Sequence, residues 1–296
     1  MMENLEENIK IIQQAYMMVK DEMIFRKSTL YMQCCRWSGV SEKDYIQLDY
    51  KLKAIRQDSA KILTIMNVIN TTYTQYQQDE YKASYFSVID NQAIEELGCF
   101  IEYLFAKYRV ILDYIEQIME ICIVPQLNDE EQNEYSKLKK SHTKFKFLLQ
   151  YVVNNIEEVN DVMNMDWFQS IRMDRDFIIH DGATCLTYDD KKDLLFKVMT
   201  TDALDEEEKL PDAFYANDNG LIYYERYWGL YISKLVVFAE TIFAFLLNSG
   251  NLDVNTKAYL DYTSSYYRNE FTDSDGNKFN DKQEVLNKIL RKLFCE

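Results

Sequence analysis

The sequence predicts an all-α protein, a helical bundle with a small β-hairpin inserted before its last long helix. Seven glycines and two prolines in 296 residues are few, and this scarcity favours long uninterrupted helices. Apolar residues recur at helical spacing through several long segments of the chain. Only after residue 183 does the pattern change to short apolar runs separated by polar turns, which is typical of strands.

The first two predicted helices cover the N-terminal quarter of the chain. One runs from residue 3 to about residue 36, and Gly39 closes it. The next begins at Ser41, where Asp44 follows three residues later and resembles a capping box. Its apolar positions are Tyr45, Leu48, Leu52, Ile55, Ile62, Ile65 and Ile69.

Two further helices are predicted before residue 165. Asp90 caps one that runs to Val124 and is stopped by Pro125. Asn128 or Asp129 opens the other, with acids in the first turn that complement the helix dipole, and it reaches about Val162.

A short helix follows, capped by Asp166 and ended by Gly182. CLTY, the turn DDKK and DLLFKVMTT then form a predicted hairpin, with a third short strand near LIYY. A buried helix from about Tyr227 to Asn248 comes next, before two short C-terminal elements. We divide the chain into an N-terminal helical extension packed on the bundle (1–84), a helical domain (85–250) with its hairpin at about 184–225, and C-terminal helical elements (251–296).

The composition excludes several classes of protein. A net charge of −16 argues against a protein that coats nucleic acid, although it allows one local basic site for RNA. Neither a P-loop nor a Rossmann glycine motif occurs, and we expect no cofactor. The six scattered cysteines indicate reduced thiols. Lys234 and Glu240 interrupt the most apolar run, which favours a buried helix over a membrane span. We therefore expect a cytoplasmic protein.

Three weaker patterns point to other chemistry. Residues 273–284 place acids and Asn at EF-hand positions, but Lys278 stands where the loop needs Gly, so a polar turn is the favoured interpretation over calcium. Cys185 and His180 could form a thiol–imidazole pair, against a buried structural Cys. A di-metal site fails because neither His142 nor His180 has Glu three residues before it, and we expect no metal.

The stretch IRMDRDFIIHDGA, residues 171–183, is the strongest candidate for a catalytic site. It holds one of only two histidines, His180, five residues after Arg175 and just before Gly182. Histidine can move a proton near neutral pH, and arginine can stabilise charge on a phosphorane. The alternative is structural: Arg175 forms a surface ion pair, and His180 caps the last helical turn.

RDFIIH at a helix end resembles the signature of the HEPN superfamily (higher eukaryotes and prokaryotes nucleotide-binding): an Arg, usually followed by a polar residue, then a His four to six residues beyond. Arg175, Asp176 and His180 match it, and the resemblance covers roughly residues 85 to 250, closest to a subgroup with a β-hairpin after the motif. It implies a metal-independent endoribonuclease in host defence or a toxin, with RNA as substrate and a neutralising antitoxin or defence-system partner. Asp176 could orient a catalytic group or hold the phosphate side open.

The spacing of the motif also bears on assembly. Five residues advance an α-helix by about 500°, so Arg175 and His180 point some 140° apart on one straight helix. Either the helix distorts near its end, or two copies each contribute a motif across a two-fold axis. HEPN ribonucleases are generally dimers with a shared cleft, and we expect a homodimer.

RNA would need a positive surface on this acidic chain. KLKKSHTKFK, residues 137–146, is the densest basic run and supplies Lys137, Lys139, Lys140, Lys144 and Lys146. These side chains are either a phosphate-binding surface, extended by Arg172, or a solvated helix face. Two rivals to the enzyme remain: a non-catalytic HEPN-like module that binds a nucleotide or partner, and a structural scaffold with Arg175 and His180 in an ion-pair network.

Overall fold

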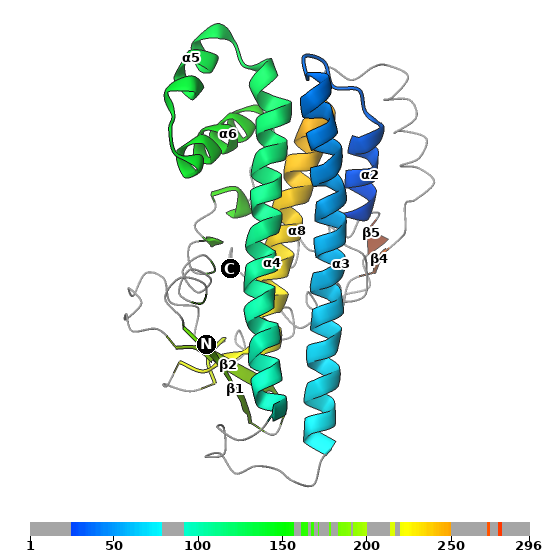
Figure 1. Ribbon diagram of the computed structural model, residues 1–296, viewed down its shortest axis with the longest axis vertical. Helices are drawn as coiled ribbons and strands as arrows, with labels where there is room; N and C mark the ends of the chain where they lie inside the picture. Colours follow the sequence, from blue (N-terminus) through cyan, green and yellow to red (C-terminus); the bar gives the residue numbers. More distant parts are fainter. Residues whose placement is uncertain are drawn as a thin grey trace.

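The computed structural model describes residues 25–78, 92–156, 161–164, 167–168, 171, 178, 183–190, 192–199, 214–216, 220–249, 271–272 and 278–279. These residues form a helical bundle with a small antiparallel sheet that precedes the last long helix (Figure 1), which confirms the predicted fold class.

Three long helices make the frame of the bundle: α3 (Glu42–Gln78), α4 (Gln92–Ile123) and α8 (Tyr224–Ser249). α3 and α4 lie side by side and run in opposite directions, with α8 behind them (Figure 1). The short α2 (Arg26–Cys34) packs on both α3 and α8. Their shared core is apolar and aromatic, and it includes Leu52, Leu104, Phe105, Trp228 and Phe243.

The start of α3 and the end of α4 follow local sequence, while Asp90, the predicted cap of α4, lies outside the described residues. The Ser41 hydroxyl accepts the backbone N–H of Asp44 at 3.2 Å, so the predicted cap of α3 is present. α2 ends at Cys34, and Gly39 does not close it; Gly39 instead takes a left-handed φ of 78° in the turn before α3. α4 stops at Ile123, and Pro125 lies in the 3-10 turn η1 (Val124–Gln126).

The predicted single helix from about residue 128 to 162 is wrong. The structure has α5 (Asp129–Lys137) and α6 (Ser141–Asn155), with Leu138 and Lys140 extended between them, and a separate 3-10 turn η2 (Asp161–Asn164). Asn128 is the N-cap of α5 and forms a capping box with Glu131. The break is held from outside, because the Ser141 hydroxyl binds the Glu116 carboxylate of α4.

The sheet is ordered β1-β2-β3 and antiparallel throughout: β1 (Cys185–Asp189), β2 (Leu194–Val198) and β3 (Ile222–Tyr223). This confirms the hairpin and the third strand. β1 lies almost directly on α4, since a Cβ on Gly98 would sit 2.5 Å from the Cys185 carbonyl oxygen. The Cys185 N–H donates to the Glu102 carboxylate at 2.8 Å, and the Thr187 hydroxyl donates to the Ile94 carbonyl at 2.8 Å.

α8 is the central helix of the bundle. It is long and apolar enough to cross a membrane, with a mean hydropathy of 1.9, yet 72% of that stretch is buried inside the molecule. Helices α2 and α4 and the sheet all contact it. The burial is that of a core helix, as the interruption by Lys234 and Glu240 indicates.

Residues 251–296 are predicted to carry helical elements, and the four residues described there are not helical. β4 (Phe271–Thr272) pairs antiparallel with β5 (Lys278–Phe279). An EF-hand loop has a helix on each side, whereas here a strand leads in and pairs back on its own chain. The pairing agrees with the polar-turn interpretation of this segment.

Candidate functional site

The predicted catalytic residues Arg175, Asp176 and His180, together with Arg172, lie outside the described residues. Their segment is therefore located by the neighbours that are described. Phe168, Ile171 and Ile178 have helical backbone, as predicted for this stretch. Trp167, Phe168 and Ile171 are buried, which fixes the start of the motif-bearing segment in the core.

Aromatic contacts attach that segment to two helices of the bundle. The ring of Trp167 packs edge-on against Tyr108 of α4, with centroids 6.3 Å apart, and against Phe238 of α8 at 6.2 Å. The Trp167 indole N–H donates to the Val162 carbonyl at 2.8 Å. The Arg109 guanidinium lies 5.1 Å from the centroid of the Phe168 ring. The start of the segment thus packs between α4 and α8 through Trp167.

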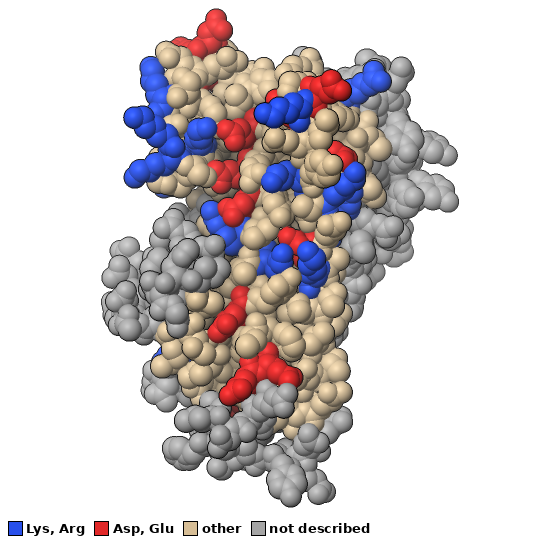
Figure 2. Space-filling model, viewed as in Figure 1, with Lys and Arg blue, Asp and Glu red and all other residues tan. Residues whose placement is uncertain are grey.

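The predicted RNA-binding lysines lie where α5 turns into α6, and we call this region the lysine corner (residues 137–146). Lys137, Lys139, Lys140 and Lys146 are exposed there, and His142 beside them is exposed as well. Figure 2 shows Lys and Arg gathered on the outer edge of the molecule over α5 and α6. Four of the five lysines are therefore open to solvent.

Lys144 differs from the other four. Its Nζ lies 3.3 Å from a Glu120 carboxylate oxygen of α4 and 5.1 Å from the centroid of the Tyr135 ring. The same carboxylate accepts the Tyr135 hydroxyl at 2.8 Å, and burial raises the pKa of Tyr135. Lys144 thus links α6 to α4 and α5, and the Glu120 carboxylate partly neutralises its charge.

An aromatic path joins the lysine corner to the motif-bearing segment. Phe145, between Lys144 and Lys146 in sequence, packs edge-on against Phe238 of α8 at 6.3 Å. Phe238 is the residue that also contacts Trp167. The lysine corner and the motif-bearing segment therefore both contact Phe238 of α8, although they are separate in the sequence.

Lys234 of α8 is a second feature near the segment, and sequence analysis did not assign it a role. It is 9% exposed, and its Nζ lies 6.0 Å from the Trp167 ring centroid and 5.6 Å from that of Tyr231. Burial lowers its pKa to about 8. A lysine within the most apolar run of the chain was the sequence sign of this environment.

The described residues offer little to a metal or a thiol mechanism. Within them, no three His, Cys, Asp or Glu side chains gather closely enough to hold a metal ion. Cys185 is buried at the start of β1, where its backbone holds the sheet to α4, and this supports its structural interpretation. Of the pair considered for thiol chemistry, His180 lies outside the described residues.

Comparison with known proteins gives no relative. No family model, curated protein or solved structure matches the chain.

Proposed function

We propose that the protein is a metal-independent endoribonuclease of the HEPN type. The observation that carries the proposal is the sequence Arg175-Asp176 followed by His180, in a segment anchored by Trp167 between α4 and α8 and followed directly by the hairpin. The HEPN resemblance implies a helical bundle in which a motif segment and a small sheet precede the closing helix. A role in host defence or as a toxin follows from the same resemblance, and the scattered cysteines and the interrupted apolar run favour the cytoplasm.

The reaction assigns one task to each motif residue. The RNA 2′-hydroxyl attacks the adjacent phosphorus, His180 accepts or donates the proton in transit, and the 5′-oxygen leaves with a proton. Arg175 stabilises the negative charge of the phosphorane with its forked donors. Asp176 orients one of these two groups. The products carry a 2′,3′-cyclic phosphate and a 5′-hydroxyl.

The exposed lysines of the lysine corner are proposed to bind the RNA backbone, with Arg172 as a further contact. Lys137, Lys139, Lys140 and Lys146 are open to a phosphate, whereas Lys144 is already engaged by Glu120. Each phosphate that a lysine neutralises releases counterions, so binding here depends steeply on salt.

The cleavage test uses the purified protein, single-stranded RNA and EDTA. We expect cleavage to persist in EDTA and to leave cyclic-phosphate and 5′-hydroxyl ends, which end-labelling by polynucleotide kinase detects. Cleavage that EDTA abolishes would contradict the metal-free reaction. RNA that binds but is never cut would instead identify a non-catalytic HEPN-like module.

A two-fold dimer is part of the proposal, because Arg175 and His180 diverge on one straight helix. Mixing Arg175→Ala chains with His180→Ala chains should restore partial activity if each site takes its Arg from one chain and its His from the other. Light scattering on the same samples gives the mass. A fully active monomer would rule out the shared site.

A further inference from the structure

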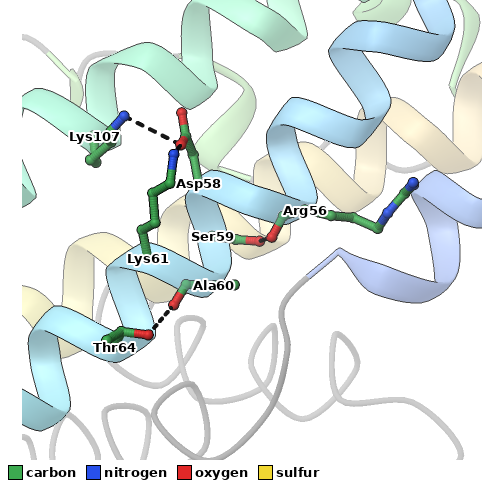
Figure 3. Close-up of polar contacts among 7 residues, drawn as sticks. All are labelled: Arg56, Asp58, Ser59, Ala60, Lys61, Thr64 and Lys107. Atoms are coloured by element: carbon green, nitrogen blue, oxygen red, sulfur yellow. Dashed lines mark hydrogen bonds and ion pairs between the residues drawn. The ribbon is translucent and has the colours of Figure 1, made fainter.

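A buried carboxylate holds two lysines together on the surface between α3 and α4. Asp58 of α3 is 4% exposed, and one of its oxygens accepts Lys61 at 2.7 Å and Lys107 of α4 at 3.3 Å (Figure 3). Because both ammonium groups bind the same oxygen, they lie within about 6 Å of each other. The cluster thus carries two positive charges against one negative charge.

This surplus charge faces solvent on one side. The side chain of Lys61 is 52% exposed and that of Lys107 is 20% exposed, while that of Asp58 is only 5% exposed beneath them. Each ammonium has three N–H donors, and Asp58 is the acceptor that both share. Lys61, with about half of its side chain exposed, can therefore still donate to a second anion from solvent.

Tyrosine rings lie beside these lysines. The Lys107 Nζ is 5.5 Å from the ring centroid of Tyr103, which is 37% exposed. Further along the same two helices, the Lys51 Nζ is 5.0 Å from the ring centroid of Tyr114. Lys51 lies seven residues before Asp58 on α3, and Tyr114 lies seven residues after Lys107 on α4, so the Lys51–Tyr114 pair is about 10 Å along the helices from the Asp58–Lys107 contact.

Helical spacing places all of these residues on facing stripes. We define the α3–α4 seam as the stripe Lys51, Ala54, Asp58 and Lys61 of α3 with the stripe Tyr103, Lys107, Val110 and Tyr114 of α4. Asp58 is the one acid among these eight residues, and it is buried. Figure 2 shows Lys and Arg interspersed with Asp and Glu over the middle and upper part of this face, and acids alone over its lower end, so the positive charge belongs to the seam residues and not to the whole face. In a chain with a net charge of −16, this stripe is locally positive.

We propose that the α3–α4 seam binds single-stranded RNA, with phosphates on Lys61, Lys107 and Lys51 and bases stacked on Tyr103 and Tyr114. Alternating cations and aromatic faces are the features that bind single strands without a sequence preference. Preorganisation by Asp58 lowers the entropy that two lysines would otherwise lose on binding. The inference rests on the proposed function for its ligand, and it gives the substrate a second surface beyond the lysine corner.

The test measures binding separately from cleavage. The probe is a fluorescein-labelled oligouridine with 2′-O-methyl groups, which the proposed reaction cannot cut, and anisotropy is recorded over a range of salt. We expect Lys61→Gln to lower the slope of log affinity against log salt by about 0.7, the value for one lost contact on a single strand. Tyr103→Ala should weaken binding about tenfold at every salt concentration, because a stacked base is lost but no charge.

The chain supplies a matched control for each variant. Lys53 is on the same helix, its side chain is also 52% exposed, and it also pairs with an aspartate, Asp49, at 2.6 Å. Lys53→Gln should leave the salt slope unchanged. Tyr50 of α3 is 65% exposed and lies outside the seam, and Tyr50→Ala should bind as the wild type does.

Equal slopes for Lys61→Gln and Lys53→Gln, wild-type affinity for Tyr103→Ala, or no binding of the probe at all would each overturn the inference. Seam-dependent binding without cleavage of an unmodified RNA would support the seam and contradict the nuclease. Cleavage of RNA together with binding that the seam variants leave unchanged would support the nuclease and contradict the seam. The two proposals therefore fail separately.

Discussion

The α3–α4 seam and the lysine corner both present lysines, but they hold them differently. In the seam, Lys61 and Lys107 converge on a carboxylate that is 4% exposed, between two long helices. In the corner, Lys137, Lys139 and Lys140 extend from the end of α5 and the turn after it, and all three are exposed.

The two regions differ in whether their charged side chains contribute to the packing of the fold or only lie on its surface. A buried carboxylate is stable only while its cations remain, so the seam couples surface charge to the packing of α3 on α4. Exposed lysines contribute little to stability, and their fields are screened by salt. Changes in the seam should therefore affect folding as well as binding, and changes in the corner should affect binding alone.

The largest expected effect on stability is at Asp58. Asp58→Asn keeps the shape of the side chain but leaves Lys61 and Lys107 without their shared anion, and we expect a loss of about 2 kcal/mol or more in the free energy of unfolding. The matched change is Glu120→Gln on α4, whose side chain is 44% exposed and pairs with Lys144 of the lysine corner at 3.3 Å. It should cost less than about 1 kcal/mol. Urea unfolding compares the two, and equal losses would remove the distinction.

Lys234 extends the comparison to a lysine that is buried in the core, where burial lowers its pKa. Its pKa is lowered from 10.5 to about 8, so the folded state releases this proton before the unfolded state does. Stability should therefore rise between about pH 8 and pH 10.5, where the unfolded chain binds the extra proton. Lys234→Met should remove that rise and stabilise the protein at pH 7 by up to about 3 kcal/mol, since each unit of the pKa change corresponds to about 1.4 kcal/mol. If the free energy of unfolding changed with pH in the same way for the variant and the wild type, burial would not be what lowers the pKa of Lys234.

The lysine corner should show the smallest effect on stability and a clear effect on binding. Changing Lys139, Lys140 and Lys146 to Gln should lower the salt slope of RNA binding by up to about 2, since each lost phosphate contact removes about 0.7. The free energy of unfolding should stay within about 0.5 kcal/mol of the wild type. Lys144→Gln alone should hardly change the slope, because Glu120 already neutralises that lysine. An unchanged slope for the triple variant would leave the corner as a solvated surface.

Local sequence was enough for most of the fold. Ser41, Pro125 and Asn128 mark helix ends through their own chemistry, and the alternation in CLTY and DLLFKV is local as well. The break between α5 and α6 was not predictable in this way, since no Gly or Pro marks it. The contact that accompanies it, from Ser141 to Glu116, comes from another helix.

The same distinction applies to the candidate sites. The Arg175–His180 motif could be found because its residues are close in sequence. The seam could not, because Lys107 reaches Asp58 from 49 residues away and only the packing of α3 on α4 brings them together. Gly98 appears in the sequence as one more helical glycine, and only its approach to Cys185 explains it.

The most direct test of the proposed nuclease activity is the cleavage activity and the melting temperature of two motif variants. With RNA in EDTA, His180→Ala should abolish cleavage while RNA binding persists, because no other residue of the motif titrates near neutral pH. Arg175→Lys keeps the charge but loses the paired donors, and most activity should go with them. Both variants should melt within a few degrees of the wild type. A large fall in melting temperature for both, with no cleavage of any RNA by the wild type, would contradict the account and leave the motif as a structural helix end.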